Sequence, residues 1–183
     1  MTITETINNC VSCPLSINFN GKKVIGHGNK QSSIAIIGEA PGETEVKYGI
    51  PFVGKAGQAL NQILLDNGIR RDTIFTTNVI KCRPFNNRTP YTDEIEACLP
   101  NLMLELSYVK PKYILVLGAT ALKAILGYNG INKWRGSWYD WGTTKCFPTF
   151  HPSYVLEGRD NWEKNLKTLK MDIAKFLRNA NKF

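Results

Sequence analysis

The chain has 183 residues, 43% of them hydrophobic and 21% charged, which is the composition of one globular domain (residues 1–183) large enough to bury a core. Lys and Arg outnumber Asp and Glu by 23 to 15, and the net charge of +8 favours a polyanionic partner such as nucleic acid. Because no apolar run could span a bilayer and residues 1–10 lack a signal-peptide pattern, we expect a cytoplasmic protein that does not contact membranes.

The first half of the chain contains two predicted strands and one predicted helix. Residues 33–37 form a short apolar run that ends at Gly38, which is typical of a buried strand. A loop rich in Gly and Pro follows at 38–45, and apolar residues recur at helical spacing over 56–67. Residues 73–80 are β-branched and aromatic and predict a second strand.

The second half continues this alternation. Thr92 is predicted to cap a helix that carries acidic residues in its first turn. Later segments are predicted as strands at 113–117 and 145–150, helices at 119–126 and 162–183, a hairpin around 138–141 and a loop at 151–160. Alternating strands and helices predict a parallel sheet that helices cover on both faces.

Four unusual segments follow the predicted strands. They are GEAPG at 38–42, Asn78, the basic loop at 81–90 and HPSY at 151–154. In parallel α/β folds, ligands bind beyond the carboxyl ends of the strands. We therefore expect these segments to meet at one edge of the sheet and to form a site there.

The chain has five cysteines, and an odd number argues against a disulfide framework. A redox role for the CxxC pair is disfavoured because no strand precedes it, and burial as a small apolar residue accounts for Cys146 but not for the pair. Four thiolates would suit either zinc or an iron–sulfur cluster, and their spacing alone does not choose between the two. The candidate ligands are Cys10, Cys13, Cys82 and Cys98.

Six sequence segments occur in a characteristic order: GEAPGETE, GIPFVGKAGQAL, TNVIKCRPFNNRTP, EIEACLP, KPKYILVLGATAL and HPSYVL. Together they resemble the iron–sulfur uracil-DNA glycosylases, family 4 of the uracil-DNA glycosylase superfamily, over nearly the whole chain. The resemblance implies an α/β fold, a three-layer α/β/α sandwich with a central four-stranded parallel sheet. It also implies a [4Fe–4S] cluster on the four candidate cysteines, and a monofunctional enzyme that hydrolyses the N-glycosidic bond of a uracil flipped out of DNA.

The resemblance assigns Glu39 and His151 to catalysis: Glu39 would act on water and the sugar cation, and His151 would stabilise the departing uracil anion. The positions that it assigns to substrate binding are Ala40, Glu45, Phe52 and Asn78. The amide of Asn78 offers one donor and one acceptor, which match uracil and not cytosine. Structural roles stay open as alternatives, such as turn capping for Asn78 and loop bracing for Glu39.

DNA contacts are predicted in two segments. Cations near Cys82 are candidate phosphate ligands, namely Lys81, Arg83 and Arg88. In segment 152–159, an apolar wedge from Tyr154, Val155 or Leu156 would fill the gap that a flipped base leaves. Many family members have a basic residue where this chain has Glu157, and Arg159 could take over that role.

Two departures from the family leave alternatives open. Val46 stands where an acid is usual, and Glu157 replaces a basic residue. One alternative is therefore a glycosylase for another damaged or modified base, and a second is a non-catalytic, cluster-stabilised DNA-binding module. The principal prediction is a monomer that acts on uracil in single- or double-stranded DNA.

Overall fold

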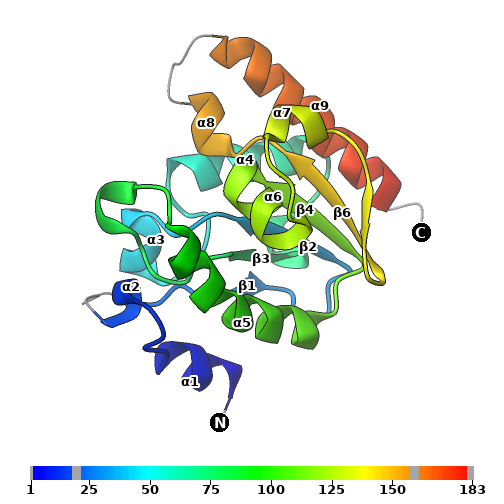
Figure 1. Cartoon of the computed structure of the whole chain (residues 1–183). Coiled ribbons are helices and arrows are strands. Elements are labelled where there is room, and N and C mark those ends of the chain that lie inside the picture. Colours follow the sequence, from blue (N-terminus) through cyan, green and yellow to red (C-terminus); the bar gives the residue numbers. More distant parts are fainter. Residues whose placement is uncertain (1, 18–21, 157–160, 181–183) are drawn as a thin grey trace.

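A six-stranded sheet forms the centre of the computed structural model, which describes residues 2–17, 22–156 and 161–180 (Figure 1). The strands pair in the order β1–β3–β2–β4–β6–β5. Their bounds are β1 His27–Gly28, β2 Ile34–Gly38, β3 Phe75–Asn78, β4 Tyr113–Leu117, β5 Tyr139–Trp141 and β6 Thr144–Thr149. Every residue of β2, β3 and β4 is buried, as expected for strands covered on both faces.

The sheet is mixed rather than wholly parallel. Strands β3, β2, β4 and β6 run parallel to one another, whereas β1 and β5 pair antiparallel with β3 and β6. The prediction of a four-stranded parallel sheet therefore has to be corrected, because it omits both edge strands. The two residues of β1 are too few to produce a periodic sequence pattern, while β5 corresponds to the hairpin predicted around 138–141.

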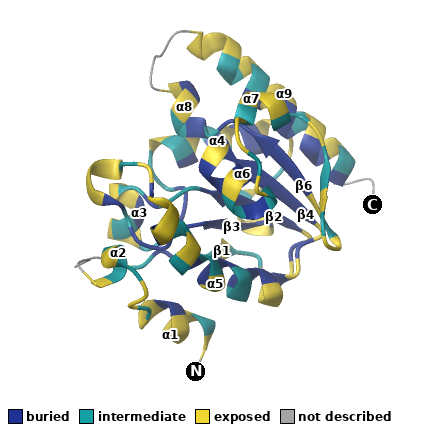
Figure 2. Cartoon of the chain, in the orientation of Figure 1, coloured by how far each residue is buried: buried dark blue, intermediate teal, exposed yellow. Residues whose placement is uncertain are grey.

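Helices cover both faces of the sheet and bury it between two apolar cores (Figure 2). On β2, Ile34 and Ile36 join the core of α4 and α9, whereas Ala35 and Ile37 join that of α5 and α6, because successive strand residues face opposite sides. The helices are α1 Ile3–Asn8, α2 Pro14–Ile17, α3 Glu43–Tyr48, α4 Lys55–Asp66, α5 Thr92–Val109, α6 Gly118–Leu126, α7 Ile131–Trp134, α8 Pro152–Leu156 and α9 Trp162–Ala180, with short 3₁₀ turns η1 Arg71–Thr73 and η2 Phe85–Asn87. Within the described ranges, no helix is long and apolar enough to cross a bilayer.

Several helix predictions need correction. Helices α3 and α8 occupy segments that the sequence predicts as loops, and Pro152 suits the first position of α8 because its missing N–H is not needed there. The N-cap of α5 is Tyr91, and Thr92 is already helical. Helix α9 is described as far as Ala180, so the predicted end at residues 181–183 lies outside the described part.

The carboxyl ends of the parallel strands meet at one edge. The register pairs Gly38 at the end of β2 with Asn78 at the end of β3. Strand β4 leads directly into α6, and β6 leads through Phe150 and His151 into α8. The segments that the sequence predicts to meet at one edge of the sheet therefore follow strand ends that lie side by side.

Candidate active site

A cavity of about 730 Å³ opens at this edge of the sheet. Its walls come from the β2–α3 loop, the first residues of α4, α6 and α8, the end of β3 and the loop before α5. The volume lies in the range of ligand pockets, about 300–1,000 Å³. The cavity brings together the six residues assigned to catalysis or substrate binding, which are Glu39, Ala40, Glu45, Phe52, Asn78 and His151.

Asn78 lies against Gly38, its register partner on β2. A Cβ atom at Gly38 would lie 2.5 Å from Asn78 Oδ1 and 2.6 Å from Phe52 Cζ, so glycine leaves the room that both side chains occupy. Asn78 is 2% exposed, and within the described ranges its hydrogen bonds involve its backbone, including its carbonyl oxygen as acceptor from Lys81 Nζ. The side-chain amide therefore keeps a donor and an acceptor for a ligand.

Phe52 forms a wall of the cavity from a strained backbone position. Its φ of 55° lies in the left-handed region, which bulky residues rarely adopt. Arg71 Nη1 donates a hydrogen bond to the carbonyl oxygen of Phe52, and a Cβ at Gly57 of α4 would lie 1.9 Å from that oxygen. The ring stacks against His151 with centroids 6.2 Å apart and planes at 28°. Contacts on both sides therefore hold the strained residue and fix its ring.

Glu45 braces the loop that carries Phe52. Its buried carboxylate accepts hydrogen bonds from the backbone N–H groups of Val53 at 2.9 Å, Gly54 at 2.7 Å and Gly42 at 3.2 Å. These three donors join the start of α3 to the start of α4. Glu45 lines the cavity, but its observed contacts are with the protein backbone.

His151 lies at the start of α8 with its ring orientation fixed. The backbone N–H of Ser153 donates to His151 Nδ1 at 3.2 Å, and Ser153 Oγ lies 2.7 Å from the same nitrogen. Because Nδ1 accepts, the neutral ring carries its proton on Nε2. Part of the residue stays accessible, yet burial of the ring lowers the pKa of His151 to about 4, against a smaller opposite effect of Glu45. The ring is therefore neutral near pH 7.

Glu39 lies across the cavity beside α6. Its carboxylate Oε2 accepts a hydrogen bond from Thr120 Oγ1. Burial raises the pKa of Glu39 above its ordinary value, and the bond from Thr120 opposes that rise because it favours the ionised form. A half-buried carboxylate of this kind can exchange a proton closer to neutral pH than an exposed one.

Lys81 was predicted to contact phosphate, but its side chain is buried. Because Lys81 is only 1% exposed, it cannot make that contact. Its Nζ donates to Glu105 Oε2 at 2.6 Å and to Thr77 Oγ1 and the carbonyl oxygen of Asn78 at 2.7 Å each. Glu105 also accepts from the N–H of Gly26 and from Thr77 Oγ1, both at 2.6 Å. The prediction is wrong because α5 brings Glu105 against the sheet, a contact that the local sequence does not reveal.

Of the three residues predicted to form an apolar wedge, one is buried. Val155 is 0% exposed and belongs to the core shared with α4 and α9, because segment 152–156 is helical and turns this side chain inward. Val155 therefore cannot enter DNA. Tyr154 and Leu156 are 40% and 42% exposed on the same helix and remain candidates. Glu157 and Arg159 lie outside the described residues.

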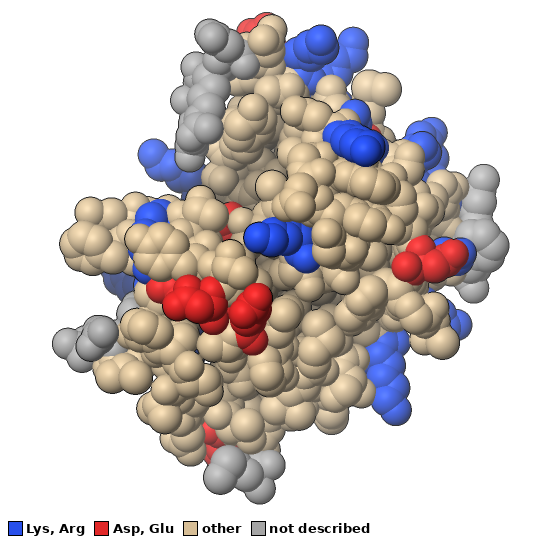
Figure 3. All heavy atoms as spheres, in the orientation of Figure 1, with Lys and Arg blue, Asp and Glu red and all other residues tan. Residues whose placement is uncertain are grey.

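Arg83 and Arg88 lie near the rim of the cavity and are both engaged with acids. Arg88 binds both carboxylate oxygens of Glu94, at 2.8 and 2.6 Å, and Arg83 lies 3.3 Å from Glu43. On the face drawn in Figure 3, Lys and Arg side chains are scattered, with Asp and Glu side chains between them. This face therefore carries separate cations rather than a continuous basic stripe.

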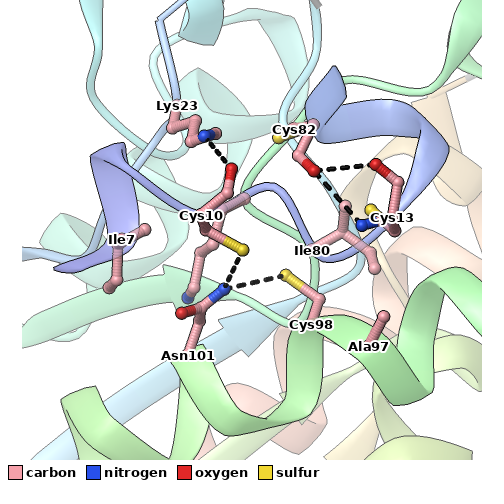
Figure 4. Close-up of a pocket in the computed structure, with 11 residues that line it drawn as sticks. Ile7, Cys10, Cys13, Lys23, Ile80, Cys82, Ala97, Cys98 and Asn101 are labelled. Carbon is pink, nitrogen blue, oxygen red and sulfur yellow. Dashed lines mark hydrogen bonds between the residues drawn. The ribbon is translucent and has the colours of Figure 1, made fainter. Parts of the chain in front are cut away.

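A second, much smaller cavity of about 10 Å³ gathers the four candidate metal ligands from the N-terminal segment, the loop after β3 and α5. Its lining includes Cys10, Cys13, Cys82 and Cys98 (Figure 4). Asn101 Nδ2 donates to Cys10 Sγ at 3.3 Å and to Cys98 Sγ at 4.0 Å. Lys23 Nζ binds the carbonyl oxygens of Asn8 and Cys10 next to them.

These described thiols line one cavity but are not arranged around a single metal-ion position. Within the described ranges, no group of three or more His, Cys, Asp or Glu side chains is arranged to hold a metal ion. Burial, and then the neighbouring Cys98, raise the pKa of Cys82 to about 12, and burial also raises that of Cys98. Burial therefore disfavours the thiolate form of both side chains. Cys146 is buried in β6, apart from this cavity.

Several residues that orient the site are missed by sequence reasoning. Thr120, Ser153 and Arg71 hold Glu39, His151 and the Phe52 backbone, respectively. Thr120 and Ser153 lie within quoted segments but carry no chemical signal of their own there, and Arg71 lies outside all six segments. Lys55 was also missed: it is exposed, begins α4 and lines the cavity, where the helix N-terminus favours anions.

Comparison with known proteins identifies relatives of this chain. The model of the uracil DNA glycosylase superfamily matches residues 25–176. A type-4 uracil-DNA glycosylase from Thermotoga maritima is 44% identical over 176 residues, covering 94% of this chain and 91% of the relative. Proteins of the same description from Sulfurisphaera tokodaii and Pyrobaculum aerophilum are 42% and 39% identical, covering 94% and 88% of this chain and 81% and 88% of the relatives.

Proposed function

The chain belongs to the uracil DNA glycosylase superfamily, among the type-4 uracil-DNA glycosylases, and from this premise we propose how it hydrolyses the N-glycosidic bond of uracil in DNA. The observation that carries the proposal is one cavity in which an unoccupied amide, a neutral imidazole and a half-buried carboxylate lie together. A base inside a duplex cannot reach such a cavity, so the uracil must first leave the stack.

We assign base recognition to Asn78 and Phe52. The amide of Asn78 would donate to O4 and accept from N3–H of uracil, while cytosine presents the opposite pattern and would leave buried groups unpaired. Phe52 would stack on the flipped base, because its ring is already fixed against His151. Glu45 supports this stacking because it holds the loop of Phe52 in place.

Bond cleavage places negative charge on uracil and positive charge on the sugar. His151 would donate its Nε2 proton in a hydrogen bond to O2 of uracil and stabilise the anion without becoming protonated itself. Glu39, when ionised, would favour the sugar cation and orient the attacking water. The products are free uracil and a sugar that has lost its base.

The donor set of the smaller cavity fits a [4Fe–4S] cluster, since its described lining contributes four thiols and no carboxylate or imidazole. We propose that Cys10, Cys13, Cys82 and Cys98 hold the cluster. When bound, it would supply cross-links between the N-terminal segment, the loop after β3 and α5, and no redox step in base release. The thiolates that it requires suit a reducing compartment, and we propose the cytoplasm.

We further propose that DNA is the partner and that one copy of the chain is sufficient for activity. The net charge of +8 favours association with a polyanion. The alternative of another target base loses support, because the described residues that line the cavity include Glu45 but not Val46. Val46 is one of the two residues that motivated that alternative, and it does not line the space in which the base would lie. The other, Glu157, lies outside the described residues.

A base-release panel tests the proposal. Oligonucleotides that contain uracil, hypoxanthine or a modified pyrimidine, each single- and double-stranded, are incubated with the purified protein, and the free base is quantified. We expect release of uracil and an intact phosphodiester backbone. Release of another base with uracil untouched would refute the assignment, and backbone cleavage would refute the monofunctional mechanism.

A further inference from the structure

The turn between β3 and α5 exposes a large aromatic side chain that the mechanism above does not use. Phe85 is 79% exposed, the highest value among the exposed large apolar residues described. Single exposed apolar residues are common on protein surfaces. The turn around Phe85 has further features that distinguish it from such a case.

The turn is braced rather than loose. Asn86 and Asn87 have φ values of 52° and 54°, so two successive residues without glycine's freedom adopt the left-handed region. Arg83 Nε donates to Asn87 Oδ1 at 2.8 Å across the turn. The N–H of Asn87 donates to the carbonyl oxygen of Pro84, and that of Arg88 to the carbonyl oxygen of Phe85, each at 3.1 Å. A strained, hydrogen-bonded turn therefore holds Phe85 in solvent.

The position of the turn relates it to the active site. Pro84, Asn87, Arg88 and Thr89 all line the large cavity, so Phe85 lies within a segment that forms its rim. In Figures 1 and 2 the segment that precedes α5 projects beside α3 and is largely exposed. A DNA strand whose uracil occupies the cavity must lie against the rim, since the base stays covalently attached to its backbone, and this turn forms one side of that rim.

The chemistry of the turn suits such a strand. Tyr91 is also exposed, and the guanidinium of Arg88 stacks on its ring at 3.8 Å from the centroid. Phe85 therefore lies in sequence between Arg83 and Arg88, with a second aromatic ring close by in the chain. Aromatic faces combined with cations are the features with which proteins bind unstacked bases, independent of sequence.

We propose that Phe85 is a stacking platform for a base adjacent to the excised uracil on the same DNA strand. The proposal rests on the proposed function, and it adds a contact outside the base cavity. When the uracil leaves the stack, its neighbours lose a stacking partner, and the ring of Phe85 replaces it. With Val155 buried, this turn supplies an apolar contact from the side of the cavity formed by the β3–α5 loop.

Fluorescence and binding measurements on substrate DNA test the proposal. Two oligonucleotides carry 2-aminopurine directly 5′ or directly 3′ of a 2′-fluorinated, non-hydrolysable deoxyuridine, and the dissociation constant and fluorescence are recorded for each variant. Stacking of the probe on Phe85 is expected to quench the fluorescence of at least one oligonucleotide. Phe85→Ala should remove this quenching and weaken binding about 5- to 150-fold, the equivalent of about 1–3 kcal/mol for one base on an aromatic ring.

Three further variants make the result specific. Phe85→Trp should retain quenching and affinity, while Phe85→Leu, which is apolar but has no ring, should lose both. Tyr108→Ala removes another exposed aromatic residue from the far end of α5 and should bind like the wild type. Thermal melting should be unchanged in all of them, because Phe85 is not part of either core.

Two results would overturn the stacking role: wild-type affinity and quenching in Phe85→Ala, or full activity of Phe85→Leu in both assays. Failure of the proposed function would look different. The wild-type protein would then release no uracil from the natural, hydrolysable oligonucleotide, whatever residue stands at position 85. The binding assay uses the non-hydrolysable strand, so it tests Phe85 independently of base release.

Discussion

The two cavities of the molecule differ in how completely the protein alone forms them. In the base cavity, two functional groups have a hydrogen-bond partner that orients them: Ser153 holds His151, and Thr120 holds Glu39. In the cysteine cavity, the four ligands come from three segments and are close, yet they do not form a metal-binding arrangement within the described residues.

The physical reason lies in the kind of interaction that each cavity needs. The base cavity uses neutral or singly charged groups, which backbone N–H groups and hydroxyls can hold before a ligand arrives. Four thiolates held close together repel one another, so a cation is needed to hold them as ligands. The protein's own hydrogen bonds therefore orient the groups of the base cavity, whereas the proposed cluster would supply the bonds that hold the four cysteines together.

The largest effect is expected from removing a cysteine ligand, which tests the cysteine cavity. Structural metal sites contribute on the order of 10 kcal/mol in small zinc peptides, because metal binding is coupled to folding. Cys98→Ala should therefore abolish the brown colour of protein purified without oxygen and lower the unfolding midpoint more than any other variant here. Cys146→Ala is the matched control, since it removes a buried cysteine outside the cavity and should keep the colour.

A colourless wild-type protein with one bound zinc would contradict the iron–sulfur assignment but keep the four-cysteine site. Equal unfolding midpoints for Cys98→Ala and Cys146→Ala would refute the assignment of a four-cysteine metal site. The two cavities would then not differ in the way described above.

The buried ion pair between the two cavities has the second-largest expected effect. Lys81 lies one residue before Cys82 and bonds to the carbonyl oxygen of Asn78, so it touches both regions. Lys81→Met leaves Glu105 as an uncompensated buried charge and should cost about 3–5 kcal/mol in the free energy of unfolding, measured with urea. Adding Glu105→Gln should recover part of this loss, because glutamine is neutral and can still accept from Gly26. If the double variant is no more stable than Lys81→Met, the charge is not the cause.

Asn78→Ala has the third-largest effect and tests whether the base cavity separates function from stability. Loss of one positioned hydrogen-bonding group typically lowers rates by about 10²–10³, or ~2.7–4 kcal/mol. Single-turnover uracil release should fall at least that far, while the unfolding midpoint and the salt dependence of DNA binding stay close to wild type. Parallel loss of activity and binding would show that Asn78 supports the structure of the cavity rather than reading the base.

Much of the fold could be predicted because long, buried elements impose periodic patterns. Strand β4 matches its predicted bounds, β2 and α4 are each shifted by one residue, and α6 begins one residue earlier than predicted. The two-residue strand β1 and the helices α3 and α8 could not be predicted in this way. They are too short to show a periodic pattern. Helix α3 is stabilised by contacts outside its own segment, such as those of Glu45 with the backbone N–H groups of Val53 and Gly54.

The residues of the base cavity could be predicted because the carboxyl ends of parallel strands meet at one edge. Side-chain direction and burial could not be predicted, and this explains both errors. Lys81 and Val155 adjoin exposed loop motifs in the sequence, but α5 supplies a buried partner for the first and α8 turns the second into the core. The orienting residues Thr120 and Arg71 lie far along the chain from the groups that they hold, so nothing in the local sequence identified them.

The smallest expected effect concerns the acidic side of the pH–rate profile. It tests whether the surroundings of Glu39 in the base cavity set the pKa of its carboxyl group. In the proposed mechanism the rate requires ionised Glu39, so it should fall as the pH drops through the pKa of Glu39, which burial raises above the ordinary value. His151 does not produce this limb, because its pKa of about 4 keeps it neutral at higher pH. The hydrogen bond from Thr120 favours ionised Glu39 and therefore limits the rise.

Thr120→Val removes this hydrogen bond with little change in volume, so the pKa of Glu39 should rise further. The acidic limb of kcat/KM should then move to higher pH by up to about one unit, which corresponds to ~1.4 kcal/mol, while the rate at high pH changes little. Thr120→Ser keeps the hydroxyl and should retain the wild-type profile. A limb that stays in place or moves to lower pH in Thr120→Val would show that another group controls it. In that case the preformed part of the cavity would comprise Asn78 and His151 without Glu39.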